Sequence, residues 1–311
     1  MEDSFFSSFC LSRGREKHHF GVCILIVSFS NWFKQNPVPA FFVLTFVIAW
    51  SIWLPLGIVA PENVFLSLLG AWAPTVSAII LTGLSEGRNG VKGFLRKILR
   101  WRVDFRWYLV VLFGIAMIAY LAIGVGTLFG VPVPEITLPA GIPHDVLLGA
   151  LPMIFLINIF LGGPLAEDIG WRGYILPKMR ERMTALNASL IIGVVWAFWH
   201  LPYFIFPAWR SAIGNVPFFW FALLTTSWSV LFAWVYVNTE SILMPVLFHA
   251  AINTTLGTLG VLGQGNGDLL SLAFNTLFTW VAVVVILMVC GQDLKRVHAM
   301  REELITESGN G

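Results

Sequence analysis

Long apolar runs, separated by short polar segments, dominate the chain. Continuous runs of this length are typical of membrane-spanning helices, whereas the strands of a membrane barrel alternate in hydropathy. The fold class predicted from this pattern is all-α, a polytopic membrane helix bundle of about eight transmembrane helices. The predicted spans are 39–59, 64–84, 108–130, one from about 146 into the stretch 162–173, then 187–206, 216–237, 241–262 and 269–290.

Three regions follow from this pattern. Residues 1–36 are mixed and basic, and their apolar piece, 20–33, is short for a span and precedes no small-residue cleavage site. They are interpreted as a cytoplasmic or interfacial extension. Residues 37–292 form the predicted transmembrane domain, and 293–311 form a charged cytoplasmic tail. No second domain, internal repeat or nucleic-acid-binding signature is apparent.

Composition supports a membrane protein. Of the 311 residues, 57% are hydrophobic and only 12% are charged, and the mean hydropathy is +0.80. Soluble domains carry about 25% charged residues. The three cysteines are scattered, so they indicate neither a disulfide framework nor a cysteine metal site.

The basic residues gather on one side of the predicted bundle. With eight spans, the N-terminus, the loops 85–107 and 164–187 and the C-terminal tail share a side, and they hold every Lys and Arg except Arg210. The positive-inside rule makes that side the cytoplasm. The chain is therefore predicted to be a multi-pass protein with both termini cytoplasmic.

One of these basic loops has an amphipathic pattern. The segment 88–106 carries seven Lys and Arg residues, and Phe94, Ile98 and Trp101 follow helical spacing within it. This combination predicts a helical piece that lies on an anionic leaflet.

The stretch 162–173, GGPLAEDIGWRG, holds three ionisable residues at the end of an apolar run. Charges near bilayer depth are costly and suggest a functional site, although a helix end at the interface would carry them at little cost. On a helix, Asp168 and Arg172 are four residues apart and share a face. Glu167 points elsewhere, so it remains unpaired. A carboxylate without a cation partner in a poorly solvated place can act as a general base.

Two later spans each carry a histidine. His200 is predicted to lie roughly 20 Å into its span, above Trp196 one turn earlier, and Pro202 allows a local bend. His249 lies roughly 12 Å into a later span, and Asn253 follows one turn on, on the same face. Together His249 and Asn253 can hold a carbonyl oxygen or a water. Each histidine could instead make a structural hydrogen bond within the bundle.

These polar residues come from three helices at similar depth and could converge. A carboxylate and two imidazoles can activate water without a metal, or can hold Zn²⁺ and its water. In the second case Glu167, His200 and His249 are the predicted metal ligands. The spacing is not the HExxH of zinc proteases.

Three ordered motifs resemble a known family. E-D-x-x-x-R at Glu167–Arg172, W-x-x-x-H at Trp196–His200 and H-x-x-x-N at His249–Asn253 are similar to the CPBP family (CaaX protease and bacteriocin-processing, or Abi). This family of intramembrane proteases includes the type II CaaX prenyl endopeptidases. The resemblance covers about residues 145–265. Asp168 stands where the family has a second Glu, and Trp196 where it has Phe, which is interpreted as a packing change.

The resemblance implies an endopeptidase that cleaves near the C-terminus of a membrane-associated protein or peptide, which is prenylated in eukaryotic substrates. Glu167 and His200 would activate water, and His249 and Asn253 would stabilise the oxyanion. Arg172, held by Asp168, would orient the site, which is expected to open to the cytoplasmic face.

Other classes remain open from sequence. A membrane immunity or binding protein could keep the polar cluster without catalysis. A membrane haem protein could use His200 and His249 as axial ligands. A transporter is less consistent with the chain, because no paired inverted repeats or matched broken helices are evident.

Overall fold

The computed structural model describes residues 31–136, 144–213, 216–259 and 269–295. Within these residues the chain is helical and contains no strand, so the predicted all-α fold class is confirmed. Most of the predicted N-terminal extension and of the C-terminal tail lies outside the described residues.

The helices follow one another with short connections. Their bounds are α3 (Pro37–Val59), α4 (Val64–Ala71), α5 (Ala73–Arg96), α6 (Phe105–Leu128), η1 (His144–Val146), α7 (Leu147–Leu161), α8 (Pro164–Gly170), η2 (Trp171–Ile175), α9 (Leu176–Arg180), α10 (Ala185–Trp199), α11 (Leu201–Ile205), η3 (Pro207–Ile213), α12 (Phe218–Thr239), α13 (Leu243–Thr258) and α14 (Leu269–Cys290).

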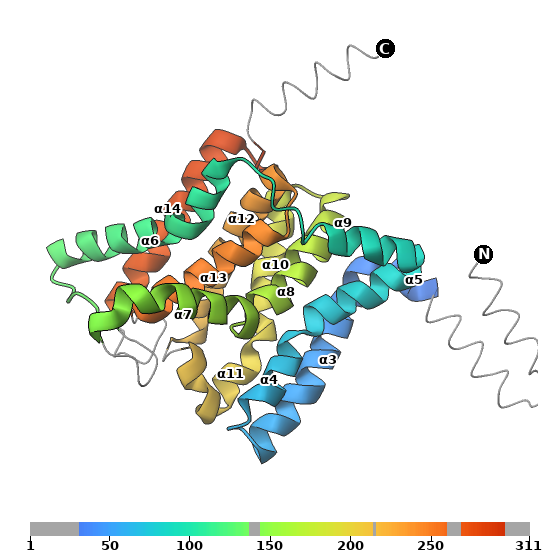
Figure 1. Ribbon diagram of the computed structural model, residues 1–311, viewed down its shortest axis with the longest axis horizontal. Helices are drawn as coiled ribbons and strands as arrows, with labels where there is room; N and C mark the ends of the chain where they lie inside the picture. The colour runs from blue at the N-terminus through green and yellow to red at the C-terminus, as the bar shows by residue number, and fades with distance from the viewer. Residues whose placement is uncertain (1–30, 137–143, 214–215, 260–268, 296–311) are drawn as a thin grey trace, which may run out of the picture.

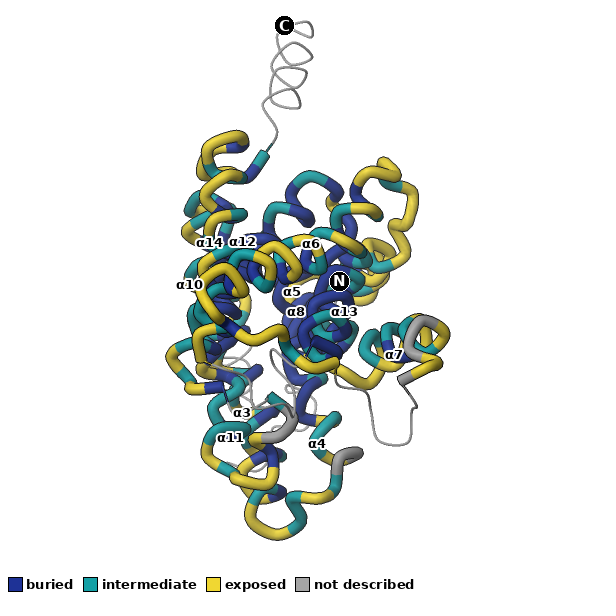
Figure 2. The backbone as a smooth tube through the Cα atoms, turned by 90° about the vertical axis from the view of Figure 1, so that its left-hand side faces the viewer, coloured by how far each residue is buried: buried dark blue, intermediate teal, exposed yellow. Residues whose placement is uncertain are grey.

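Helix α12 is the centre of the bundle. Its most apolar stretch is 67% buried, against 22–28% for α3, α6 and α14. Figure 1 shows α10, α12 and α13 side by side in the middle, with α6 and α14 on one flank and α3 to α5 on the other. In Figure 2 the α8 and α13 backbones are among the most buried, whereas α7 is largely exposed. Polar groups carried inward by α8 and α13, such as Glu167 and His249, are therefore largely shielded from solvent and lipid.

The outer helices expose apolar side chains, as a membrane protein requires. Large hydrophobic residues that are more than half exposed include Val43, Val47, Phe113, Met117, Val285 and Met288, from α3, α6 and α14. A contiguous exposed apolar surface of this kind is unfavourable in water and favourable against lipid. The chain is an integral membrane protein.

The count of eight spans is not confirmed. Among the described residues, α3, α6, α12 and α14 are long and apolar enough to cross a membrane, and a fifth span exists if α7 and the segment Pro164–Arg180, bent by 47°, are taken together. The other predicted spans are short or interrupted: 187–206 is divided into α10 and α11, and α13 has 16 residues.

The second predicted span, 64–84, is divided as well. The chain turns at Trp72, so α4 ends at Ala71 and α5 starts anew with Pro74 in its first turn. Proline has no N–H to donate and is tolerated at this position, where a helix leaves its first N–H groups unbonded. By contrast, α14 has the bounds 269–290 that the sequence predicted.

The basic segment 88–106 does not behave as a separate surface helix throughout. Helix α5 kinks at Gly87, where φ is 64°, and then continues to Arg96. Phe94 is buried and lies against the ring of Tyr174, whereas Trp101 is exposed. Part of the predicted lipid-facing side therefore packs on the protein itself.

Helices α10 and α12 pack closely against each other in the core. Gly193 on α10 lies directly against the α12 backbone, where a Cβ atom would come 2.5 Å from the Cα of Thr226. Small residues at such crossings let two membrane helices approach closely. This approach fixes the position of α10, which carries Trp196 and His200.

Gly193→Ala is expected to destabilise the protein by about 1–3 kcal/mol, because the new methyl group must displace the α12 backbone. Denaturation in detergent micelles measures this change. Gly114→Ala on α6 is the control, since its Cβ would meet nothing within 4 Å. Equal stability of the two variants would contradict the close α10–α12 contact.

Candidate active site

The sequence stretch 162–173 forms a helix break inside the bundle. Helix α7 ends at Leu161, and α8 starts at Pro164 with Gly163 as its N-terminal cap. Gly163 has φ of 99°, a conformation that glycine adopts at little cost. The break places Glu167 in the first turn of α8, beside Gly163.

Glu167 is held in a defined orientation. Its side chain is 5% exposed, and its Oε2 accepts a hydrogen bond of 2.6 Å from the indole Nε1–H of Trp196. Its Oε1 lies over Gly163, where a Cβ atom would overlap it. Glu167 has no ion-pair partner within 4 Å among the described residues, as the sequence predicted.

Asp168 and Arg172 form the predicted ion pair. Oδ1 of Asp168 accepts a hydrogen bond of 2.6 Å from Nη1 of Arg172, and both side chains are almost fully buried. Residues 171–175 form a π-helical turn, so the pair spans the junction between α8 and η2. The arginine guanidinium also lies between two aromatic rings, with Cζ 4.6 Å from the centroid of Trp196 and 4.5 Å from that of Phe232.

The same aspartate reaches a second helix. Its Oδ2 lies 3.0 Å from Nδ1 of His249 on α13. An ionised carboxylate can only accept, so Nδ1 of His249 is the donor and Nε2 remains available. The sequence did not predict this contact, because the two residues are 81 positions apart.

His200 occupies a helix end rather than the middle of a span. Helix α10 ends at Trp199, His200 is its C-cap, and α11 starts at Leu201 with Pro202 in its first turn. This interruption is the local bend that Pro202 predicted. Nδ1 of His200 lies 2.9 Å from the backbone carbonyl oxygen of Trp196, which only accepts. The ring therefore donates through Nδ1 and presents Nε2 as its basic nitrogen.

Asn253 lies one turn beyond His249 on α13, as predicted. Its Nδ2 donates a hydrogen bond of 3.1 Å to the carbonyl oxygen of Gly162, at the C-terminal end of α7. An amide nitrogen carries two hydrogens, so one N–H remains for another acceptor. Asn253 therefore ties α13 to the helix break that carries Glu167.

One cavity of about 540 Å³ brings four of the predicted residues together. Glu167, His200, His249 and Asn253 all line it, from α8, α10 and α13, and Trp196 lines it beside them. Asp168 and Arg172 are not part of the lining and lie behind it, where they hold His249 and Trp196. The cluster therefore divides into four groups that face the cavity and two that support them.

The rest of the lining is mainly aromatic and apolar, and sequence reasoning did not identify it. Tyr203, Trp209, Phe221 and Trp228 contribute rings, and the polar Asn158 donates to the hydroxyl of Thr254 on α13. Apolar walls with a few convergent polar groups are typical of small-molecule and peptide sites. Aromatic residues are common throughout this chain, so no sequence pattern separated these four from the others.

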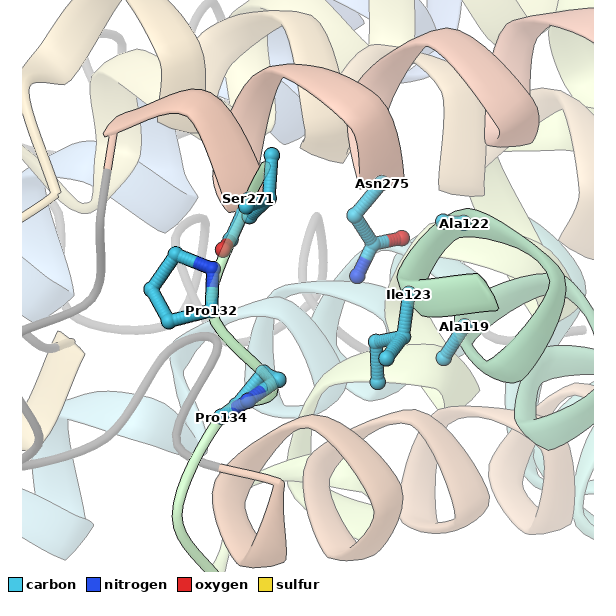
Figure 3. Close-up of a pocket in the computed structure, with 8 residues that line it drawn as sticks. Ala119, Ala122, Ile123, Pro132, Pro134, Ser271 and Asn275 are labelled. Carbon is cyan, nitrogen blue, oxygen red and sulfur yellow. The ribbon is translucent and has the colours of Figure 1, made fainter. Parts of the chain in front are cut away.

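A second cavity, between α6 and α14, is too small to hold a peptide or another organic substrate. Ser271 and Asn275 contribute its polar side chains, and Pro132 lies beside Ser271 with Pro134 below it (Figure 3). Its volume of about 10 Å³ is close to the minimum for a single water. The larger cavity is therefore the candidate active site.

The lining residues indicate the direction in which this cavity extends from the polar cluster. Beyond the polar cluster it is lined by Pro61 and Glu62, between α3 and α4, and by Trp209 of η3. In Figure 1, α4 and α11 lie at the lower end of the bundle, whereas α9 and the far end of α5, which carry basic residues, lie higher. The cavity thus extends away from the basic loops. The opening of the site to the cytoplasmic face and the cytoplasmic placement of the termini both stay predictions.

The donor set was compared with the predicted zinc site. Among the described residues, no group of three or more His, Cys, Asp or Glu side chains is arranged to hold a metal ion. Glu167 is engaged by Trp196, and His249 is engaged by Asp168. The side chains as placed do not fit a three-ligand zinc site. Zn²⁺ stays a prediction, and no step below is assigned to it.

Fold and site together define an integral membrane protein whose interior holds a carboxylate, two imidazoles and an amide around one cavity. Residues 149–255, about a third of the chain, match the family model described as type II CAAX prenyl endopeptidase Rce1-like. The chain is also 23% identical over 233 residues to CAAX prenyl protease 2 of Methanococcus maripaludis, covering 71% of this chain and 84% of that relative.

The resemblance that the three motifs predicted is therefore confirmed: over this region the chain is similar to Rce1-like type II CAAX prenyl endopeptidases. The residues matched by the family model include all six predicted site residues. These comparisons support an intramembrane endopeptidase of the CaaX-processing type.

Asp168→Asn is expected to destabilise the protein by about 3–5 kcal/mol, because the buried Arg172 then keeps a charge without its counter-ion. Denaturation in detergent micelles measures the loss. Glu181→Gln is the control: it breaks the pair of Glu181 with Lys178, whose side chains are 61% and 32% exposed, and such pairs contribute about 0–1 kcal/mol. An Asp168→Asn variant as stable as this control would contradict the role of the buried pair.

Proposed function

We propose that this protein hydrolyses a peptide bond near the C-terminus of a membrane-associated protein, with water activated by Glu167 and His200. The observation that carries the proposal is the convergence of Glu167, His200, His249 and Asn253 on one cavity inside the bundle. The named relative and the family model, both described as CaaX prenyl proteases or endopeptidases, supply the reaction class and the substrate class.

The first step requires a base beside the water. Glu167 has no cation partner among the described residues, and its Oε1 is not engaged by the Trp196 indole. It accepts a proton as the water oxygen bonds to the scissile carbonyl carbon. His200, which presents Nε2, is the second group that holds and orients this water.

The second step requires donors for the oxyanion that forms on the carbonyl oxygen. Asn253 has one amide N–H beyond its bond to Gly162, and His249 supplies an N–H from Nε2 when it is protonated. Asp168 accepts from Nδ1 of His249 and so fixes the orientation of its ring. The intermediate then breaks its C–N bond, the proton held by Glu167 passes to the leaving amine, and a carboxylic acid and an amine are released.

The cavity walls suit a substrate with an apolar portion. Aromatic rings from α11, η3 and α12 line the space beyond the polar cluster. A prenylated C-terminal peptide would place its lipid against such walls and its scissile bond at Glu167. Prenylation of the substrate is the finer part of the proposal and rests on the named relatives.

Glu167→Gln is expected to lower kcat by about 10²–10⁴-fold, the usual contribution of a general base. The amide keeps the shape of the carboxylate but cannot take the proton. The measurement is cleavage of a fluorogenic farnesylated CaaX peptide by protein purified in detergent and returned to liposomes.

Glu240→Gln is the control for this experiment, because that side chain is 73% exposed and pairs with Arg100 far from the cavity. If Glu167→Gln cleaves as fast as the wild type, Glu167 is not the base. If the wild type itself cleaves no membrane-associated peptide, the proposal gives way to a binding role for the polar cluster.

Asn253→Leu is expected to lower kcat by about 10²–10³-fold, as the loss of one oxyanion donor does in other hydrolases. The same peptide assay measures it. Because Asn253 also bonds to Gly162, the melting temperature is recorded in parallel. A variant with unchanged kcat would remove Asn253 from the oxyanion site.

A further inference from the structure

We propose that Trp196 is a positioning residue for the catalytic carboxylate, and that it acts through its indole N–H rather than through packing alone. The inference rests on the proposed function, because it assigns Trp196 a role in orienting Glu167 for proton transfer. From the sequence, Trp196 in place of the family's Phe was interpreted as a packing change. The geometry points to a hydrogen bond that phenylalanine cannot make.

The bond itself is short and buried. Nε1 of Trp196 lies 2.6 Å from Oε2 of Glu167, and the two side chains are 2% and 5% exposed. The indole nitrogen can only donate, so it cannot exchange roles with its partner. A charge-assisted hydrogen bond in a poorly solvated place is strong, and here it fixes one of the two carboxylate oxygens.

Fixing one oxygen leaves the other for the water. Oε1 lies over Gly163, at the position where any other residue would have its Cβ. Without the indole donor, the carboxylate could rotate about its last side-chain bond and exchange its two oxygens. With that donor, Oε2 stays bonded to the indole and Oε1 keeps a single position as the basic oxygen. Catalysis needs such preorganisation of the group that takes the proton.

Trp196 is itself held by the other members of the site. The guanidinium of Arg172 lies over its ring at 4.6 Å, and its ring centroid is 5.7 Å from that of His200 and 5.3 Å from that of His249. A cation over an indole face is attracted to the ring and draws electron density from it, so the N–H becomes a better donor. Arg172 and Glu167, which do not pair directly, are therefore coupled through one side chain.

A substitution at a neighbouring tryptophan can distinguish the effect of losing the hydrogen bond from the effect of losing packing. Trp199 lies on the same helix and is fully buried, yet its Nε1 has no hydrogen-bond partner among the described residues. It contacts the rings of Trp53 and Trp171 and, as Trp196 does, the ring of His200. Trp199→Phe therefore removes the same volume from α10 without removing a bond to the carboxylate, and it serves as the matched control.

The test compares Trp196→Phe with a variant that carries 3-benzothienylalanine at position 196. That amino acid keeps the shape of the indole and replaces its N–H by sulfur, so it removes the donor and leaves the packing. Both variants are expected to lower kcat by about 10–100-fold, the usual effect of losing a hydrogen bond to a charged group. KM is expected to stay within about threefold of wild type for the benzothienyl variant, because the cavity wall keeps its shape.

Trp199→Phe should keep kcat within about threefold of wild type. In a Glu167→Gln background, the benzothienyl replacement should lower kcat no further, because its effect passes through the carboxylate. A benzothienyl variant with wild-type kcat would overturn the positioning role while the proposed function stands. If the wild type shows no cleavage, the proposed function is the part that fails, and this role fails with it.

A spectroscopic measurement tests the hydrogen bond independently of activity. Indole ¹⁵N–¹H spectra of the whole protein in micelles, with the Trp196 signal assigned from its absence in Trp196→Phe, should show a downfield N–H proton. Glu167→Gln should move this signal upfield by at least several tenths of a part per million, and Glu240→Gln should leave it in place. An unshifted signal in Glu167→Gln would show that the bond does not form.

Discussion

A single buried ion pair, Asp168 with Arg172, underlies the arrangement of the site. Each partner has a second contact: the carboxylate accepts from His249, and the guanidinium lies between the rings of Trp196 and Phe232. An unpaired charge at this depth would be very costly, so the two side chains must stay together. Because they do, helices α8, α10, α12 and α13 are held around one cavity wall.

The polar site coincides with two helix breaks. The reason is that the lipid interior offers no hydrogen-bond partners to backbone groups. Interrupted helices free carbonyl groups that lipid cannot satisfy, so they are tolerated only inside the protein or beside a cavity. Here Asn253 donates to Gly162 at the end of α7, and Trp50 donates to Trp199 at the end of α10. The side chains that donate hydrogen bonds to the free carbonyl groups at the breaks thus also connect the helices that carry the polar site residues.

Local spacing was sufficient to predict much of the site, and contacts between distant helices were not. The pairing of Asp168 with Arg172 and the break near Pro202 follow from helix geometry over a few residues. The resemblance to CaaX proteases was recognised from three motifs of the same short range. The bonds from Trp196 to Glu167 and from Asp168 to His249 join residues 29 and 81 positions apart, so no periodicity could indicate them. The count of eight spans was not confirmed, because the hydropathy pattern does not show that the helices are interrupted at Trp72 and His200.

Gly163 limits which substitutions the candidate active site can accept. Its positive φ disfavours every residue with a Cβ, and the space that a Cβ would occupy already holds the Glu167 carboxylate. Two separate constraints therefore forbid the same change, and relieving one leaves the other. A compensating replacement of Glu167 would remove the carboxylate proposed as the base. Neither residue is therefore free to change alone, and we expect relatives that lack this glycine to lack the carboxylate as well.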